Sequence, residues 1–300
     1  MPPTVDTGPG SAVRDATGPV ASAGRRGYPR TYLMCPPTYF EVVYAINDWM
    51  SPGEQVDRPR ALAQWHTLVD TYRALGHEVV VIDAVEGLPD MVFVTDSGVV
   101  VDGVALGARY RCAQRRAEAG HVLRWFRENG LLKPRLPRFV NEGEGDFLVV
   151  GDVILGGTGF RSDPRSHAEA AAHLGRPVVP LTLVDSRYYH LNTALGVLDN
   201  ATIAYLPAAF SPESLLLLRR MFPDAVIAEE SDTQWLGLNL VSDGLHVVLP
   251  AQATRLSDQL VDRGYDPVPV DYSEFLKSGG GIKCSTMELR GYRQFCEMGS

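Results

Sequence analysis

Four times along the chain, two short apolar runs are joined by a tight polar turn. The turns are Asp102-Gly103, Gly151-Asp152, Asp199-Asn200 and Asp243-Gly244. Asp-Gly and Asp-Asn between apolar runs are strong signals for a β-hairpin. The turns recur roughly every 45–50 residues, a period that indicates repeated supersecondary units. The first strand of the first hairpin is predicted to begin at Met91.

Helical and short strand patterns fill the intervals between these hairpins. Apolar residues at helical spacing predict helices over residues 61–75, 114–129, 166–174, 212–221 and 254–263. Strands near Thr31 and Cys284 would complete a fifth unit at the chain ends. Because neighbouring units must cover each other's sheet edges, we expect an α/β fold, a five-bladed ββαβ propeller with a pseudo-fivefold repeat. An ordinary α/β sandwich with chance turn spacing is the alternative.

Composition narrows the functional classes. The chain has 300 residues, 45% hydrophobic, which is enough to bury a large core. Residues 1–28 are predicted to form a disordered tail and residues 29–300 a single catalytic domain. A net charge of −8 argues against a nucleic-acid partner, and no apolar stretch is long enough to span a membrane. The oligomeric state, a homo-oligomer included, stays open.

The cysteines also bear on location and cofactors. They lie far apart, with no Cys/His spacing typical of a zinc site. We expect neither a metal nor an organic cofactor. Scattered cysteines in a chain of this size indicate reduced thiols and a cytoplasmic protein. The four are Cys35, Cys112, Cys284 and Cys296.

Polar residues stand where the hairpin strands begin, and in a ring of repeats these positions converge. Each has an ordinary structural explanation, as a turn cap, a solvated acidic loop or a buried histidine. Together, at equivalent points of a repeat, they indicate a site. They are Asp90 and Asp96 in the first hairpin, Glu142, Glu144 and Asp146 in the second, His190 and Asn192 in the third, and Cys284 in the last unit.

These residue types suit one reaction on a guanidinium group. Carboxylates bind a planar cation through paired hydrogen bonds. The thiolate of Cys284 would attack the central carbon, with the nearby cation lowering the thiol pKa. His190 would protonate the departing amine and later take a proton from water. A cysteine protease needs only one group to orient its histidine, so the surplus of acids favours a small cationic guanidino substrate.

The chain resembles the guanidino-group-modifying (pentein) superfamily over residues 31–290. Members include dimethylarginine dimethylaminohydrolases, arginine deiminases, arginine dihydrolases and amidinotransferases, which share a propeller of five ββαβ units. The resemblance implies that Cys284 is the covalent nucleophile, His190 the general acid/base, and Asp90 and Asp96 guanidinium ligands. The matching stretches are Pro89–Asp96, Glu142–Asp146, His190–Thr193 and Gly279–Cys284.

The same resemblance implies substrate-binding roles for further residues. Arg161 looks like a clamp for the substrate carboxylate, and Arg109 is a weaker match with Arg111 as its competitor. Asn47, in the aromatic loop 39–49, is expected to bind substrate. That loop is our candidate lid.

Three departures from the family pattern leave choices open. An extra acid allows either Glu142 or Glu144 to be the catalytic carboxylate; Glu142 is favoured, with Asp146 assisting. Asn192 stands where arginine deiminases have an aspartate and could still accept a hydrogen bond. Asp96 stands where arginine dihydrolases usually have asparagine, whereas residues 34–37 and 45–50 resemble that branch.

The predicted function is a hydrolase that cleaves a guanidinium C–N bond of methylated arginine or arginine. A dimethylargininase-like reaction through a cysteine thiouronium would give citrulline and an amine. The alternatives are an arginine dihydrolase that gives ornithine, an amidinotransferase if an amine replaces water, and a non-catalytic propeller binding protein. The nucleophile Cys284 speaks against the last of these.

Overall fold

The computed structural model describes residues 24–292. Most of the predicted tail, residues 1–23, and residues 293–300, which include Cys296, lie outside this range. Within it the chain forms five three-stranded sheets and flanking helices, a mixed α/β arrangement. In each sheet the middle strand runs antiparallel to one neighbour and parallel to the other.

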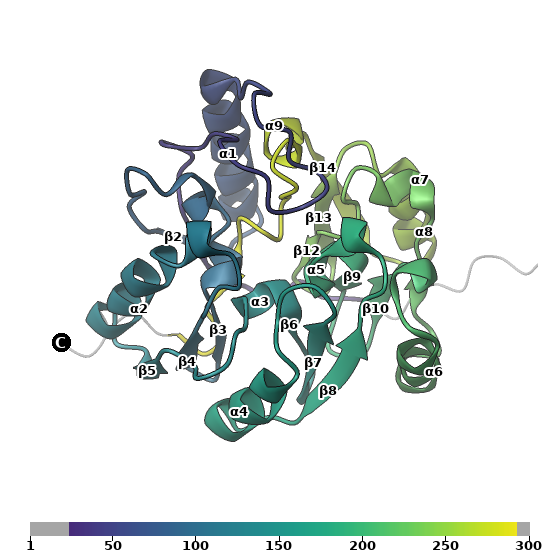
Figure 1. The fold of residues 1–300 in the computed structure, drawn as a ribbon. Coiled ribbons are helices and arrows are strands. Elements are labelled where there is room, and N and C mark those ends of the chain that lie inside the picture. Colours follow the sequence, from purple (N-terminus) through teal and green to yellow (C-terminus); the bar gives the residue numbers. More distant parts are fainter. Residues whose placement is uncertain (1–23, 293–300) are drawn as a thin grey trace, which may run out of the picture.

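The sheets follow the expected order of hairpin and connecting strand. They are β3 (Gly98–Val101), β4 (Val104–Gly107) and β5 (Leu132–Arg135); β6 (Phe147–Val150), β7 (Val153–Thr158) and β8 (Val178–Thr182); β9 (Leu195–Val197), β10 (Ile203–Tyr205) and β11 (Val226–Ile227); β12 (Val241–Ser242), β13 (His246–Pro250) and β14 (Asp266–Val270); and β15 (Met287–Glu288), β1 (Thr31–Met34) and β2 (Glu78–Val81). Figure 1 shows these units following one another around the molecule.

The longer helices match the predicted ranges within a few residues. They are α1 (Arg58–Ala74), α2 (Glu118–Glu128), α4 (Arg165–Leu174), α6 (Pro212–Met221) and α8 (Thr254–Asp262). Short helices are α3 (Gly143–Asp146), α5 (Leu191–Ala194), α7 (Glu230–Thr233) and α9 (Ser273–Leu276), with 3₁₀ turns η1 (Pro89–Val92), η2 (Val94–Ser97), η3 (Ala113–Arg115), η4 (Ser186–Tyr188) and η5 (Pro207–Ala209). Helices α2, α4, α6 and α8 lie at the periphery (Figure 1).

The predicted hairpins are confirmed, and the first shows why its turn needs those residues. Asp102 and Gly103 both have positive φ, 50° and 78°. A two-residue turn of this kind matches the twist of the strands, and aspartate and glycine tolerate its angles. β3 and β4 pair antiparallel, with Val101 opposite Val104.

The first and last strands of the described chain share one sheet. β1 pairs antiparallel with β15 and parallel with β2. This sheet has the same order as the other four, so the fifth unit is assembled from both ends of the chain, as the sequence predicts. The five sheets are therefore consistent with five repeats.

Three predicted elements are wrong in detail, and all of them lie beside the candidate site. The segment from Met91 to Asp96 forms 3₁₀ turns instead of a strand, and the predicted helix 114–129 is split into η3 and α2. Cys284 lies in turns that precede β15 rather than in a strand. The buried Arg115 explains the first difference, because its guanidinium binds the carbonyls of Asp90 and Phe93, which in a strand would pair with a neighbouring strand.

None of the helices within residues 24–292 is long and apolar enough to cross a membrane.

Candidate active site

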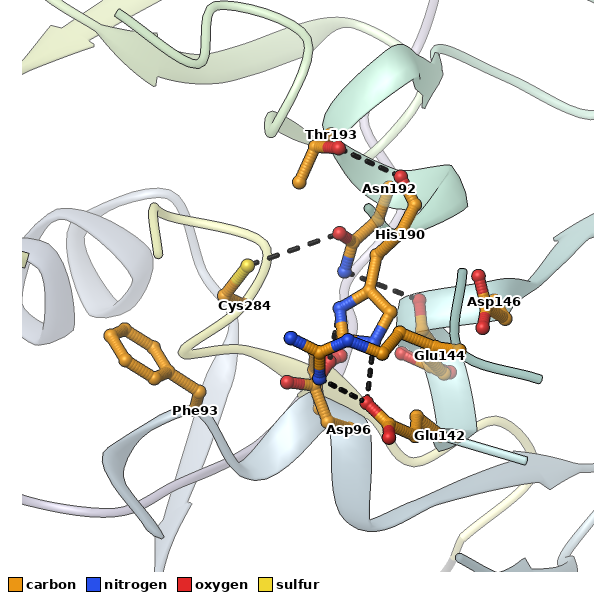
Figure 2. Close-up of polar contacts among 12 residues, drawn as sticks. Phe93, Asp96, Glu142, Glu144, Asp146, His190, Asn192, Thr193 and Cys284 are labelled. Atoms are coloured by element: carbon orange, nitrogen blue, oxygen red, sulfur yellow. Dashed lines mark hydrogen bonds and ion pairs between the residues drawn. The ribbon is translucent and has the colours of Figure 1, made fainter. Parts of the chain in front are cut away.

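The thiol of Cys284 lies between two asparagines from neighbouring units. Its backbone N–H donates to Oδ1 of Asn239 at 3.0 Å, and Nδ2 of Asn239 donates to the sulfur at 3.2 Å. The thiol lies 3.9 Å from Oδ1 of Asn192 (Figure 2). Cys284 is 1% exposed. These contacts fix the sulfur in one position within a buried polar cluster.

The surroundings keep this thiol protonated. Burial raises the pKa of Cys284 to about 12, with a further upward contribution from the negative charge of Asp96 and an opposing one from the hydrogen bond of Asn239. A neutral thiol therefore predominates at neutral pH. Forming a thiolate requires that a positive charge enter the cluster or that the nearby negative charge be compensated.

The imidazole of His190 lies between two carboxylates. Nε2 is 2.7 Å from Oε2 of Glu142, and Nδ1 is 3.6 Å from Oδ1 of Asp96 (Figure 2). Gly145 makes this arrangement possible, because a Cβ there would lie 2.6 Å from Oδ1 of Asp96 and 3.1 Å from Nδ1 of His190. Any side chain at this position would displace one of the two groups.

The two carboxylates hold a proton on this histidine. Burial lowers the pKa of His190, but the charge of Asp96, the hydrogen bond to Glu142 and the charge of Asp146 outweigh it, so that the pKa is raised overall. A protonated imidazole is a general acid. The cluster therefore pairs a neutral thiol with an imidazole whose protonated form is stabilised by the surrounding carboxylates.

The side chains of Glu142 and Glu144 point to different partners. Glu142 contacts His190 and accepts a hydrogen bond from Nη1 of Arg161 at 2.9 Å. Glu144 is ion-paired with Lys283 and Arg290. Burial would raise the pKa of both carboxyls, but their cationic partners lower it overall. Only the first of the two acids touches the imidazole.

Asp146 connects the second and third units. Its Oδ2 accepts a hydrogen bond from Oγ of Ser162 at 2.6 Å, and its Oδ1 accepts one from the backbone N–H of Leu191 at 3.1 Å. Leu191 begins α5, directly after His190. Burial raises the pKa of Asp146 to about 6, although the charge of His190 opposes this. The contact fixes the position from which the imidazole projects.

The acids of the two 3₁₀ turns, Asp90 and Asp96, are held by different partners. Asp90 accepts hydrogen bonds from the hydroxyls of Tyr44 at 2.9 Å and Ser278 at 3.2 Å. Asp96 is ion-paired through Oδ2 with Nη1 of Arg115 at 2.6 Å. Burial raises the pKa of Asp90, while the charge of Arg115 lowers it. Figure 2 shows Asp96 beside His190 and Phe93 on the side of Cys284.

The aromatic loop 39–49 makes hydrogen bonds around the site. Nδ2 of Asn47 donates to the carbonyl of Ser278 at 3.1 Å, and Nε1 of Trp49 donates to the carbonyl of Arg187 at 2.9 Å. Nη2 of Arg161 donates to the carbonyl of Ile46 at 2.6 Å. Asn47 therefore lies against the glycine segment before Cys284, and Arg161 joins the loop to Glu142.

The predicted arginine clamps differ in their placement. Arg161 is 4% exposed and its guanidinium lies 4.7 Å from the ring centre of Tyr189. Arg109 is exposed, and its Nε donates to the carbonyl of Pro137 at 2.9 Å. The backbone of Arg109 pairs with Asn141, which places it at the edge of the site rather than within the cluster. Arg111 contacts Glu142 through its backbone N–H.

Two residues of the cluster, Asn239 and Arg115, were not predicted from the sequence. Asn239 lies two residues before β12, as Asp96 lies two residues before β3, and that equivalence is the signal that could have identified it. Arg115 gave no comparable signal, because it falls in a segment predicted to be helical. Among residues 24–292 there is no cluster of His, Cys, Asp and Glu that could hold a metal ion.

Comparison with known proteins identifies several relatives, although no family model matches the chain. It is 49% identical over 266 residues to an N(G),N(G)-dimethylarginine dimethylaminohydrolase of Mycobacterium tuberculosis, which covers 88% of each chain. It is 32% identical over 251 residues to a protein of that name from Streptomyces coelicolor, covering 79% of this chain and 89% of the relative. The bifunctional arginine dihydrolase/ornithine cyclodeaminase ArgZ of Synechocystis is 33% identical over 266 residues, 86% of this chain and 37% of ArgZ.

Solved structures give the same relationships. A structure of ArgZ superimposes with a TM-score of 0.84 and 32% identity, covering 87% of this chain and 40% of that one. The N-terminal domain of ArgZ with bound product gives a TM-score of 0.83 at 31% identity, covering 87% and 98%. A dimethylarginine dimethylaminohydrolase adduct gives a TM-score of 0.72 at 21% identity, covering 87% and 100%, which is a likeness of fold.

Proposed function

The chain belongs to the dimethylarginine dimethylaminohydrolase family of guanidino-group-modifying enzymes, hydrolases that act on C–N bonds of linear amidines, and we propose that it hydrolyses N(G),N(G)-dimethylarginine to citrulline and dimethylamine. We further propose that the five sheets are the blades of one closed ring and that residues 29–300 form a single catalytic domain.

One observation carries this proposal: Cys284, His190 and Glu142 occupy one buried cluster together with further carboxylates. His190 bonds Glu142 at 2.7 Å, and the thiol lies against Asn192 and Asn239. A nucleophile, a proton donor and binding sites for a planar cation are the groups that guanidinium hydrolysis needs.

Substrate binding supplies the charge that the thiol lacks. Asp96 and Asp90 receive the guanidinium, and Arg161 receives the α-carboxylate of the substrate. Asn47 and Asn192 contribute hydrogen bonds. The bound cation offsets the negative charge of Asp96, which is one of the causes of the raised pKa of Cys284. The thiolate is thereby favoured only when a substrate is present.

The reaction then proceeds in two halves at the guanidinium carbon. The sulfur of Cys284 forms a bond to that carbon, and the C–N bond to dimethylamine breaks as His190 gives its proton to the leaving nitrogen. Water next attacks the thiouronium carbon and loses a proton to His190. The C–S bond then breaks as the hydroxyl of the tetrahedral adduct becomes the carbonyl of citrulline and gives its proton to the departing sulfur. Citrulline is released, and Cys284 returns to the neutral thiol. Glu142 stabilises the imidazolium in both halves.

Arginine dihydrolase activity is the second candidate. It is favoured by the relation to ArgZ, 33% identical over 266 residues, and by the TM-score of 0.83 to the ArgZ domain with bound product. Two successive hydrolyses would then give ornithine and ammonia. Position 96 distinguishes the two candidate activities, dimethylarginine hydrolysis and arginine dihydrolysis. The carboxylate of Asp96 adds a negative charge to the site, which an asparagine would not.

A product assay tests the proposal. The purified protein is supplied separately with asymmetric dimethylarginine, monomethylarginine and arginine, with and without glycine as an acceptor. Citrulline with dimethylamine supports the proposal, whereas ornithine with ammonia from arginine moves the chain to the dihydrolase branch. Ornithine that forms only with glycine indicates amidino transfer. No product from any substrate contradicts a hydrolase of arginine derivatives.

A further inference from the structure

A pocket lies at the far end of the strands that lead away from the candidate active site. Its volume is about 370 Å³, within the range of small-molecule sites. The lining includes residues from the first strand of every sheet: Val101, Leu148, Leu195, Val241 and Glu288. No group in the proposed mechanism lines it.

The position of this pocket follows from the repeat. The candidate site is built from residues that precede β3, β6, β9, β12 and β15, whereas the pocket is lined largely by these strands and by the turns that follow them. Leu240 and Lys283, which precede β12 and β15, also line it. The inner strands have two to four residues. At about 3.3 Å per residue, the turns that follow these strands lie roughly 7–13 Å along the strands from the residues that precede them.

An ion-pair cluster separates the two sites. Glu144, which is 1% exposed, is paired with Lys283 and Arg290, and both of these cations also line the pocket. Lys283 directly precedes Cys284 in the chain. The wall of the pocket is therefore made by the same segment that presents the nucleophile.

The acidic side chains that line the pocket all have cationic partners, whereas some N–H donors of the basic side chains have no acceptor. The basic residues are Arg30, Arg176, Lys283 and Arg290, against Asp102, Asp199 and Glu288. Every one of these acids already has a cationic partner: Arg176 for Asp102, Arg25 for Asp199, and both Arg30 and Arg290 for Glu288. Around Arg30, Arg290 and Lys283 the carboxylates are Glu288 and the buried Glu144, so this part of the wall carries three positive charges and two negative ones.

Two of the basic residues have hydrogen-bonding capacity to spare. Nε of Arg30 is buried without a hydrogen-bond partner in the part of the chain that the structure describes. Nζ of Lys283 donates to Glu144 and to the carbonyl of Thr286, which uses two of the three N–H donors of an ammonium group. Unfilled donors beside a net positive lining select an acceptor-only ligand, and oxyanions are of that kind.

We propose that this pocket binds a small oxyanion, either inorganic phosphate or the carboxylate of an organic acid, between Arg30, Arg290 and Lys283. Binding draws the guanidinium of Arg30 partly away from Glu288 and gives its free donor a partner. The site is independent of guanidinium hydrolysis, since none of these residues contacts the substrate in the proposed reaction.

Isothermal titration of the full-length protein with sodium phosphate and, separately, sodium succinate tests this assignment. Sodium chloride at the same ionic strength serves as the blank. We expect saturable binding of at least one of the two anions, weakened about tenfold or more in Arg30→Gln, the loss of about 1.4 kcal/mol. The control is Arg255→Gln, which removes an exposed arginine paired with Glu229 outside the pocket.

Each outcome decides a point. Binding of phosphate alone identifies phosphate as the ligand, and binding of succinate alone identifies a carboxylate. Heats no larger than those of chloride overturn the proposal, as does equal weakening in Arg30→Gln and Arg255→Gln. Thermal unfolding gives a second measure, since an anion bound only by the folded state raises the midpoint of the wild type and of Arg255→Gln but not of Arg30→Gln.

Discussion

Nδ1 of His190 lies 3.6 Å from Oδ1 of Asp96, and neither atom has a hydrogen-bond partner among residues 24–292. The other side of each group is occupied, by Glu142 for the imidazole and by Arg115 for the carboxylate. An acceptor with an open lone pair therefore faces a ring nitrogen in a buried site. A substrate N–H could donate a hydrogen bond to this free oxygen of Asp96.

Replacing Asp96 by asparagine tests this relationship through pH. Among the groups that raise the pKa of His190, the charge of Asp96 is the largest contribution. The imidazolium of Asp96→Asn should lose its proton at lower pH, so the alkaline limb of the kcat profile moves toward acid. We also expect kcat/KM to fall about tenfold to hundredfold, as for loss of a charged hydrogen bond of about 1.5–3 kcal/mol. The measurement is the pH dependence of citrulline formation.

The matched control is Asp102→Asn, in the exposed first hairpin turn. Its pH profile should coincide with that of the wild type. An alkaline limb that stays in place in Asp96→Asn would mean that a group other than His190 sets it.

Cys284→Ser should abolish turnover and leave the fold intact. The serine hydroxyl can occupy the place of the thiol between Asn192 and Asn239, but it is a far weaker nucleophile at neutral pH. We expect a loss of at least about a thousandfold in kcat. Citrulline formation and thermal unfolding are measured together. Cys112→Ser, outside the cluster, is the control, and residual activity of Cys284→Ser near that of the control would refute covalent catalysis by Cys284.

Asn239→Ala tests a residue that the sequence reading overlooked. Its amide donates to the sulfur of Cys284 at 3.2 Å, and this bond lowers the thiol pKa. Without it the thiolate should form less readily, so we expect kcat to fall about tenfold to hundredfold. Alkylation of Cys284 by iodoacetamide at neutral pH, with Cys284→Ser as the blank, should then be slower than in the wild type, because the thiolate is the reacting form. An unchanged alkylation rate would assign Asn239 a purely structural role.

The repeat and its hairpins could be predicted because turn chemistry and apolar runs are local signals. The Asp102-Gly103 turn and helix α6 were predicted at their observed positions. The 3₁₀ turns around Asp96 could not be predicted, because the apolar run from Met91 satisfies a strand pattern equally well. The backbone conformation of this run depends on Arg115, nineteen positions from Asp96. Its guanidinium binds Asp96 and the carbonyls of Asp90 and Phe93.

The candidate site shows the same division. The spacing of the repeat predicted that Cys284, His190 and Asp96 lie at equivalent points, and in the structure they belong to one cluster. The spacing could not predict in which direction each acidic side chain points. Glu142 and Glu144 are two residues apart, yet one contacts His190 and the other Lys283. That difference depends on cations supplied by distant segments, Arg161 for one acid and Lys283 for the other, which no local pattern contains.

Arg115 should be essential for stability. It is 3% exposed and joins Asp96 to Glu118, whose pKa burial raises to about 7 in spite of the arginine. Arg115→Ala leaves both carboxylates buried without their partner, and loss of one side of a buried ion pair costs about 3–5 kcal/mol. Urea unfolding measures the free energy of unfolding. The control is Arg58→Ala, whose exposed pair with Glu41 should contribute less than about 1 kcal/mol.

A stability loss for Arg115→Ala as small as that of Arg58→Ala would show that solvent or a rearranged side chain replaces the guanidinium. In that case the 3₁₀ turns would have to be stabilised by packing alone.

Glu144→Gln should destabilise the protein in a pH-dependent way. Lys283 and Arg290 outweigh burial and hold the pKa of Glu144 below its ordinary value, so its ionised form stabilises the folded state. That contribution is complete above the unfolded pKa, about 4.3, and is lost as the pH falls through the lower folded value. The variant should therefore be less stable than the wild type by about 3–5 kcal/mol at neutral pH. The difference should shrink as the pH falls below that unfolded value, since the wild-type carboxyl then also loses its charge.

Urea unfolding at a series of pH values, down to the lowest at which both proteins are folded, measures this difference. Glu229→Gln, in an exposed pair with Arg255, is the control and should show a small difference with little dependence on pH. A loss in Glu144→Gln that is constant with pH would place the stabilisation in packing around the side chain. A loss that shrinks toward acid identifies the charge of Glu144, and with it the ion-pair cluster that holds Lys283 beside the nucleophile.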